Sequence, residues 1–317
     1  MNYSGEKKAM KMLCDGESIS IPSPNAMNYN RIEFNAKVVA FDKNAKAVIS
    51  HGKTIPWSSA YIVIDFEAVY VYEFLREPRL LEKIPHKLLI TDSIDVCISV
   101  GAGFIADLVI TTPSGSFHKD IIWNGSCEDI RVESIGATFA DCTLMYYIDG
   151  VYKDVWLFGD SYFDHWCKHM IECGGNNFYL DGHSGRGSEI AISSLNMNLS
   201  YSKPKKIVWF MGMNDPDGDE VNPSWLKCYY QLSDICLDNN IELVLSTVPN
   251  TPKINNRHKN EIVKGSGYRY LDVCSAVGAD TSSCWASGFI DSDGVHPSTE
   301  GARVIAEYIL SALHEIE

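Results

Sequence analysis

An apolar run at residues 155–158 stops abruptly at Gly159-Asp160-Ser161, and a segment with helical periodicity follows it to about residue 173. A short apolar run without alternation is typical of a strand that is buried on both faces, as in a parallel sheet. The turn after such a strand lies at the carboxyl edge of the sheet, where functional groups gather. We therefore expect Ser161 to present its hydroxyl at that edge.

Strand and helix patterns alternate from about residue 151 onward, which predicts an α/β domain with a parallel sheet between helical layers. The expected strands are 155–158, 207–211, 242–247 and 268–273, and the expected helices are 161–173, 188–198, 224–239 and 298–314. The first half of the chain has short strand-like segments separated by turn residues, which is typical of an all-β sandwich. Those segments are 31–41, 47–50, 61–74, 87–90, 96–100, 105–111, 130–139 and 143–148. We expect a β-sandwich accessory domain at 1–150 and a catalytic domain at 151–317.

Composition excludes several classes of partner. The 317 residues carry a formal net charge of −14, which disfavours nucleic acids and anionic membrane surfaces as partners. No apolar run is long enough to span a bilayer, and the N-terminal residues lack the apolar region of a secretory signal. The ten cysteines show no C-x-x-C spacing, which favours thiols over disulfides or a zinc site. We expect a cytoplasmic protein without a metal site; a homo-oligomer stays open.

Ser161 has the partners that a nucleophilic serine requires. A serine hydroxyl is a weak nucleophile until a base takes its proton, although a serine in this position is also a common helix cap. The later motif Asp293-Gly-Val-His296 offers a histidine as the base and a carboxylate on the same loop to orient it. The order Ser161, Asp293, His296 predicts a serine hydrolase.

Two motifs between these residues can stabilise an oxyanion. Gly185 lies in a glycine-rich loop, and Asn214 follows the expected strand at 207–211. Acyl transfer requires hydrogen-bond donors aimed at the oxygen on which negative charge develops. The N–H groups of Ser161 and Gly185 and the side-chain amide of Asn214 are suitable donors.

Neighbouring motifs are open to other readings that we favour less. His165 and His169 have the i, i+4 spacing of a metal site, but no third ligand accompanies them, so a solvated or partly packed helix face is the expectation. The stretch Asp215-Pro-Asp217-Gly-Asp219 is similar to a calcium loop but lacks the glycine at the sixth position of such loops.

Taken together, Gly159-Asp160-Ser161, Gly185, Gly212-Met-Asn214 and Asp293-Gly-Val-His296 resemble the four sequence blocks of the SGNH (GDSL-type) hydrolases, in family order. The resemblance covers about half of the chain. It implies a flavodoxin-like three-layer αβα domain that uses no metal or organic cofactor. It also implies that Ser161 is the nucleophile, that His296 is the base oriented by Asp293, and that Ser161, Gly185 and Asn214 form the oxyanion hole.

The expected substrate class is acetylated carbohydrate. A β-rich domain followed by this type of hydrolase is similar in order to the family 2 carbohydrate esterases, in which a jelly-roll domain precedes the catalytic one. Aromatic rings can stack on sugars, and we expect Trp285 and Tyr162 to contact a small-molecule substrate. Oligosaccharide O-deacetylation is therefore the predicted activity. A broad short-chain esterase or lysophospholipase, or a carbohydrate-binding protein that has lost activity, are the alternatives.

Overall fold

The computed structural model describes residues 4–10, 18–22, 31–39, 43–51, 59–74, 78–86, 92–102, 105–122, 129–174, 178–279 and 285–314. The chain divides into two compact units, Met1–Ile148 and Asp149–Glu317. Among the described residues, no helix is both long enough and apolar enough to span a membrane.

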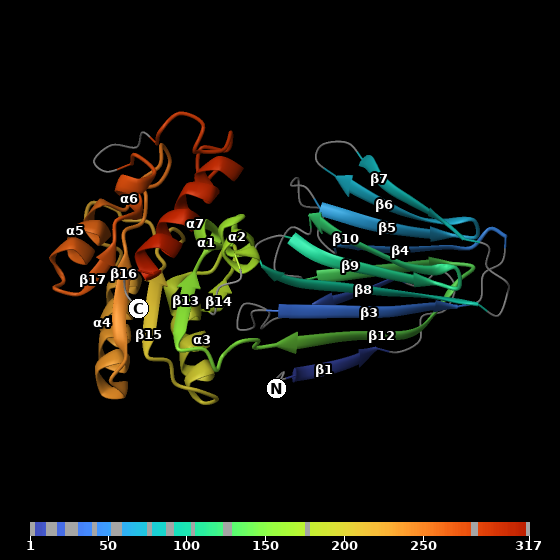
Figure 1. Cartoon of the computed structure of the whole chain (residues 1–317), viewed down its shortest axis with the longest axis horizontal. Helices are drawn as coiled ribbons and strands as arrows, with labels where there is room; N and C mark the ends of the chain where they lie inside the picture. Colours follow the sequence, from blue (N-terminus) through green and yellow to red (C-terminus); the bar gives the residue numbers. More distant parts are fainter. Residues whose placement is uncertain are drawn as a thin grey trace. The chain divides into compact units, whose positions relative to one another are not determined.

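The described part of the N-terminal unit consists of two six-stranded sheets in which every pairing is antiparallel (Figure 1). The first sheet has the order β1 (Ser4–Met10), β12 (Thr138–Tyr147), β3 (Arg31–Val39), β8 (Ser93–Ala102), β9 (Ile105–Thr112) and β10 (Gly115–Ile122). The second has the order β2 (Ser18–Pro22), β11 (Asp129–Ile135), β4 (Lys46–His51), β5 (Ser59–Asp65), β6 (Ala68–Phe74) and β7 (Pro78–Pro85).

One hydrophobic core joins these two sheets. Side chains along β3 alternate between buried and partly exposed, because successive residues of a strand point to opposite faces. Phe34 and Val38 from the first sheet share a buried cluster with Ile49 and Ile62 from the second. The inner faces of the two sheets therefore pack against each other.

The outward face of β3 carries polar side chains that bind one another. Glu33 accepts hydrogen bonds from Arg31 at 2.9 Å and from the Asn35 amide at 2.8 Å. The guanidinium of Arg31 also lies 3.7 Å from the ring centroid of Tyr147, which is opposite it on β12. This face presents hydrogen-bonding groups.

Turns divide two segments that the sequence predicts as single strands. The segment 61–74 is the hairpin of β5 and β6, where the Asp65 side chain accepts from the N–H groups of Glu67 and Ala68, both at 2.9 Å. The segment 130–139 likewise divides into β11 and β12 near Gly136, which has a φ of 63°. An aspartate that bonds to the backbone two and three residues ahead is a common turn signal. The expected strand at 87–90 lies outside the described residues.

The C-terminal unit contains a five-stranded parallel sheet in the part of the chain that the structure describes. Its order is β14 (Phe178–Gly182), β13 (Val155–Gly159), β15 (Lys206–Phe210), β16 (Glu242–Ser246) and β17 (Arg269–Leu271). Counted from β13, this is the order 2-1-3-4-5 of flavodoxin-like sheets. The chain leaves β13 toward β14 on one side and returns to β15 on the other, so the switch point lies between β13 and β15.

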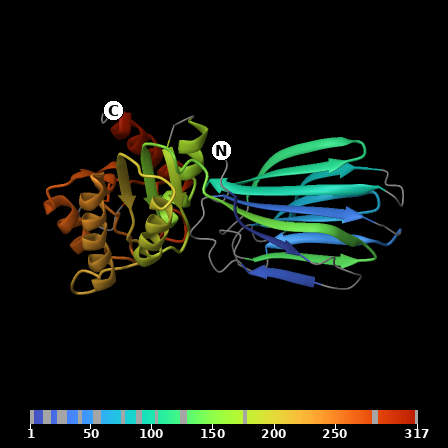
Figure 2. The same cartoon turned by 90° about the horizontal axis from the view of Figure 1, so that it is seen from below.

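Helices cover both faces of this sheet, as Figure 2 shows. The helices are α1 (Ser161–Asp164), α2 (Cys167–Cys173), α3 (Ser188–Leu199), α4 (Pro223–Asn239), α5 (Arg257–Gly265), α6 (Val273–Ala276) and α7 (Thr299–His314). Helices α2 and α7 pack together on one face, and α3 and α4 pack together on the other. Leu157 and Val208 share a core with Ala302 and Ile305 of α7. The parallel sheet between helices agrees with the predicted fold class.

The helix predicted at 161–173 is broken in the structure. Helix α1 ends at Asp164 and α2 begins at Cys167. Between them Trp166 has a φ of 72°, which is rare for a bulky residue because its Cβ crowds the backbone in this conformation. The apolar periodicity of the sequence continues across this break, so it could not predict that the helix is interrupted.

Replacement of Gly301 by alanine is expected to destabilise the C-terminal unit. A Cβ at this position in α7 would lie 2.0 Å from the backbone carbonyl oxygen of Phe289, which cannot move aside as a flexible side chain would. We expect Gly301→Ala to lower the free energy of unfolding by about 1–3 kcal/mol in urea titrations. Gly265→Ala is the control, because that site in α5 has open space around it, and it should leave stability equal or slightly higher. Equal stability of the two variants would contradict the packing at Gly301.

Candidate active site

A buried carboxylate joins the turns that follow β13 and β15. Asp160 is 1% exposed and precedes α1, where one of its oxygens accepts from the N–H of Tyr162 at 3.0 Å. Its other oxygen accepts from the N–H groups of Gly212 at 3.1 Å and Met213 at 2.9 Å. Burial raises the pKa of Asp160, and these three hydrogen bonds act in the opposite direction. The side chain thus holds two loops together at the switch point of the sheet.

Ser161 occupies the first position of α1 directly after this turn, and only 3% of the residue is exposed. The turn is tight because Phe163 packs against it. A Cβ on Gly159 would lie 2.1 Å from the Cβ of Phe163, and one on Gly182 would lie 2.3 Å from the Phe163 ring. Glycines at the ends of β13 and β14 therefore let the helix start close against the sheet.

Asp293 and His296 form a hydrogen-bonded pair on one loop. The Asp293 Oδ2 lies 2.6 Å from the His296 Nδ1, and Oδ1 accepts from the N–H groups of Val295 at 2.7 Å and His296 at 2.9 Å. Burial acts to raise the pKa of Asp293, but the hydrogen bond with His296 and the two backbone bonds outweigh it, so the pKa is lowered. An ionised carboxylate here favours the tautomer with the proton on Nδ1, which leaves Nε2 as the basic nitrogen.

Contacts from α1 place this loop beside Ser161. The Tyr162 hydroxyl donates to the Val295 carbonyl at 2.5 Å. The ring of His165, just after α1, lies parallel to the ring of His296, with centroids 5.1 Å apart and an interplanar angle of 19°. Among the described residues, no hydrogen bond joins the Ser161 hydroxyl to His296 itself. Catalytic hydrogen bonds of this kind often shorten only when substrate binds.

The loop that carries Gly185 lies between α1 and the loop of Asn214. On one side, the N–H and hydroxyl of Ser184 donate to Asp164 at 3.0 and 2.9 Å. On the other, the Asn214 amide donates to the Arg186 carbonyl at 3.1 Å. Gly185 has a φ of 79°, in the region that favours glycine. The structure therefore brings the loops of the three expected oxyanion donors together around the start of α1.

Arg186 is a buried residue that links several segments of this region by hydrogen bonds, and sequence reasoning missed it. Its guanidinium is fully buried and bonds to the Asp181 carboxylate at 2.8 Å and to the Gly159 carbonyl at 2.9 Å. Burial acts to raise the pKa of Asp181, but Arg186 and His183 hold it far below its usual value. Because Asp181 lies in β14 and Gly159 ends β13, the guanidinium ties the Gly185 loop to these two neighbouring strands. The sequence signal that could have indicated this role is an arginine between two glycines, shortly after an apolar strand.

Two of the three aspartates of the calcium-like stretch, Asp215 and Asp217, bind protein groups. Asp215 accepts from the N–H of Ser188 at 3.0 Å and from its hydroxyl at 2.7 Å. Asp217 pairs with the fully buried Lys259 at 3.4 Å, and the same ammonium donates to the Asp215 carbonyl. These contacts anchor the loop after Asn214 to α3 and α5.

Tyr162 and Trp285, which we expected to contact substrate, lie in the hydrophobic core. Tyr162 is 0% exposed and Trp285 is 8% exposed. Their rings meet edge to face with centroids 5.7 Å apart, and the Trp285 indole donates to the Asn250 carbonyl at 2.8 Å. Buried rings offer almost no surface to a sugar; Tyr162 instead supports the loop of His296 through its bond to the Val295 carbonyl.

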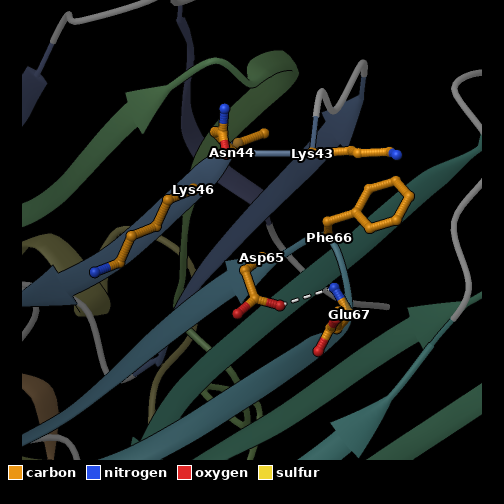
Figure 3. A pocket seen from close by; sticks show the side chains of 7 residues that line it. Lys43, Asn44, Lys46, Asp65, Phe66 and Glu67 are labelled. Carbon is orange, nitrogen blue, oxygen red and sulfur yellow. Dashed lines mark hydrogen bonds between the residues drawn. The ribbon is translucent and has the colours of Figure 1, made fainter.

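A cavity of about 580 Å³ lies elsewhere, in the N-terminal unit (Figure 3). The turns before β4 and after β5 line it with Lys43, Asn44, Ala45, Lys46, Asp65, Phe66 and Glu67. None of the residues expected for catalysis belongs to it.

Several solved structures are similar to parts of this chain. A GDSL-like lipase from Bacteroides thetaiotaomicron is 19% identical with a TM-score of 0.42, and the match covers 52% of this chain and 89% of that one. The lipase/acylhydrolase from Enterococcus faecalis is 20% identical with a TM-score of 0.39, covering 51% and 95%. The galectin LEC-6 from Caenorhabditis elegans is 11% identical with a TM-score of 0.32, covering 42% and 94%. No family model and no curated protein matches the chain. Likenesses at this level do not establish an activity.

Removal of the Asp181 carboxylate should destabilise the site strongly. Asp181→Asn leaves the fully buried Arg186 without its counter-charge, and we expect a loss of about 3–5 kcal/mol of unfolding free energy. The control is Asp154→Asn, which removes an exposed ion pair with Lys205 and should cost less than about 1 kcal/mol. Urea unfolding of both variants at neutral pH measures the difference. Similar costs for the two would mean that the buried pair does not hold the site.

Proposed function

We propose that the C-terminal unit is a serine ester hydrolase. Ser161 is the nucleophile, His296 the general base, and Asp293 the group that orients it. The observation that carries the proposal is the 2.6 Å contact between Asp293 and His296 on a loop bound by Tyr162, the residue next to Ser161. A base with its orienting carboxylate beside a serine at the start of a helix is the arrangement that acyl transfer requires.

The reaction proceeds in two steps. The Ser161 oxygen attacks the ester carbonyl as His296 Nε2 takes its proton, and the N–H groups of Ser161 and Gly185 with the Asn214 amide bind the resulting oxyanion. The alcohol leaves with the proton from His296, and an acyl group remains on Ser161. Water, deprotonated by His296, then releases the acid. Asn214 has two amide protons, so its bond to the Arg186 carbonyl leaves one for the substrate.

As the substrate class we propose O-acetylated carbohydrates. Three features support this choice. The order of a β domain before the hydrolase unit resembles that of family 2 carbohydrate esterases. The net charge of −14 disfavours anionic lipid surfaces. The network of Arg31, Glu33 and Asn35 on β3 offers hydrogen-bonding groups that suit sugar hydroxyls better than acyl chains. The buried rings of Tyr162 and Trp285 do not contribute to this choice.

A serine-directed fluorophosphonate probe tests the nucleophile. We expect the wild-type chain to be labelled at Ser161, and Ser161→Ala to lose both labelling and ester hydrolysis. Asn214→Ala should still be labelled but should lower kcat by about a hundredfold, because one oxyanion donor is lost. Ser200→Ala, at the exposed end of α3, is the control and should match wild type. A wild-type chain that does not react with the probe would instead favour a binding protein without activity.

An acyl-chain panel tests the substrate class. We expect p-nitrophenyl acetate to be cleaved far faster than the octanoyl ester, and acetylated oligosaccharides to lose about 42 Da per acetyl group with chain length unchanged, as O-deacetylation requires. Mass spectrometry of the products measures this directly. Activity that rises toward octanoyl esters would replace the sugar deacetylase with a broad esterase or lysophospholipase.

A further inference from the structure

His165 has no part in the chemistry described above, yet it contacts the proposed base directly. Its ring lies parallel to that of His296 with centroids 5.1 Å apart. We propose that His165 is a positioning residue, a stacking platform that fixes the plane of the His296 ring so that Nε2 points toward Ser161. The inference rests on the proposed function and adds a residue to it.

The need for a platform follows from the other contacts of His296. Asp293 binds the ring at one nitrogen, Nδ1, and a single hydrogen bond does not by itself fix the χ1 and χ2 angles that set the plane of the ring. Tyr162 approaches at 6.4 Å with its ring tilted by 60°, which limits the ring on one edge. Among the ring contacts of His296 within the described residues, the near-parallel one with His165 lies against the face of the imidazole and so restrains its plane. About 32% of the His296 side chain is exposed, so solvent does not restrict it.

The backbone next to His165 is in an unfavourable conformation. The break between α1 and α2 falls directly after it, where Trp166 has a φ of 72° and a ψ of −32°. A bulky residue keeps such angles only when surrounding contacts hold it there. His165 itself follows the last residue of α1 and has a ψ of 83°, outside the helical range. The backbone strain therefore lies at Trp166, the residue directly after His165.

The charge state of His165 suits this role. The pKa of His165 is lowered to about 4, mainly by burial and to a smaller extent by His296. Asp291 and Asp293 from the facing loop and Asp164 from α1 act in the opposite direction but do not overcome burial. His165 is therefore neutral at pH 7. This matters because His296 becomes positively charged when it takes the serine proton, and a cation stacked on it would oppose that step.

Three variants test the proposal on the full chain. We expect His165→Ala to lower kcat on p-nitrophenyl acetate by about tenfold or more with little change in KM, because the base is misaligned while substrate binding is kept. His165→Phe keeps a flat uncharged ring and should restore kcat to within about threefold of wild type. His169→Ala removes a histidine on α2 that contacts Cys173 and should behave as wild type. Wild-type kcat in His165→Ala, or a His165→Phe variant as slow as His165→Ala, would overturn the stacking role.

A second measurement does not depend on turnover. The proton between His296 Nδ1 and Asp293 gives a downfield NMR signal, recorded in a Ser161→Ala background to remove catalysis. We expect this signal to broaden in His165→Ala and to stay sharp in His165→Phe and His169→Ala. If no ester is hydrolysed but the signal follows this pattern, the proposed function fails and the stacking contact stands. If the wild-type chain is an active hydrolase and His165→Ala changes neither kcat nor the signal, the role of His165 fails and the function stands.

Discussion

The candidate site depends first on the carboxylate of Asp160. One buried side chain accepts three backbone N–H groups, from Tyr162 on one side and from Gly212 and Met213 on the other. These groups belong to the turns after β13 and β15, which diverge at the switch point of the sheet. Because both turns bind the same carboxylate, Ser161 and the loop of Asn214 cannot move apart without leaving unpaired polar groups in a dry interior.

Buried cations hold the remaining loops of the site. Arg186 bonds to Asp181 and to the carbonyl of Gly159, and Lys168 donates to the carbonyl of Gly182 at 2.9 Å. Lys259 similarly binds the loop after Asn214. Loops have few apolar contacts of their own. A buried cation cannot exchange its protein partners for water, so the loop that provides those partners is held in one position. The loop of His296 differs, because it is more exposed and is held by a hydrogen bond from Tyr162 and by ring contacts with Tyr162 and His165.

Local patterns predicted a large part of this architecture. The apolar runs of β13 and β15 could be recognised as buried parallel strands, and the alternation that follows indicated helices on both faces. The pairing of Asp293 with His296 was also predictable, because both residues lie on one short loop. Local patterns failed where turns interrupt apolar segments, as at Asp65 between β5 and β6, because hydrophobic periodicity does not register where a strand reverses.

The sequence by itself determined the order of the elements, the pairing of Asp293 with His296, and the turn that places Ser161 at the start of a helix, since each depends on neighbours within a few residues. Tertiary structure alone decided that Tyr162 and Trp285 are buried, that Arg186 also binds the carbonyl of Gly159, and that the helix predicted at 161–173 is interrupted at Trp166. The burial of the two rings and the bond from Arg186 to Gly159 arise from contacts between segments far apart in the chain. Burial and ring stacking depend on which surfaces meet after folding, and no local spacing encodes that.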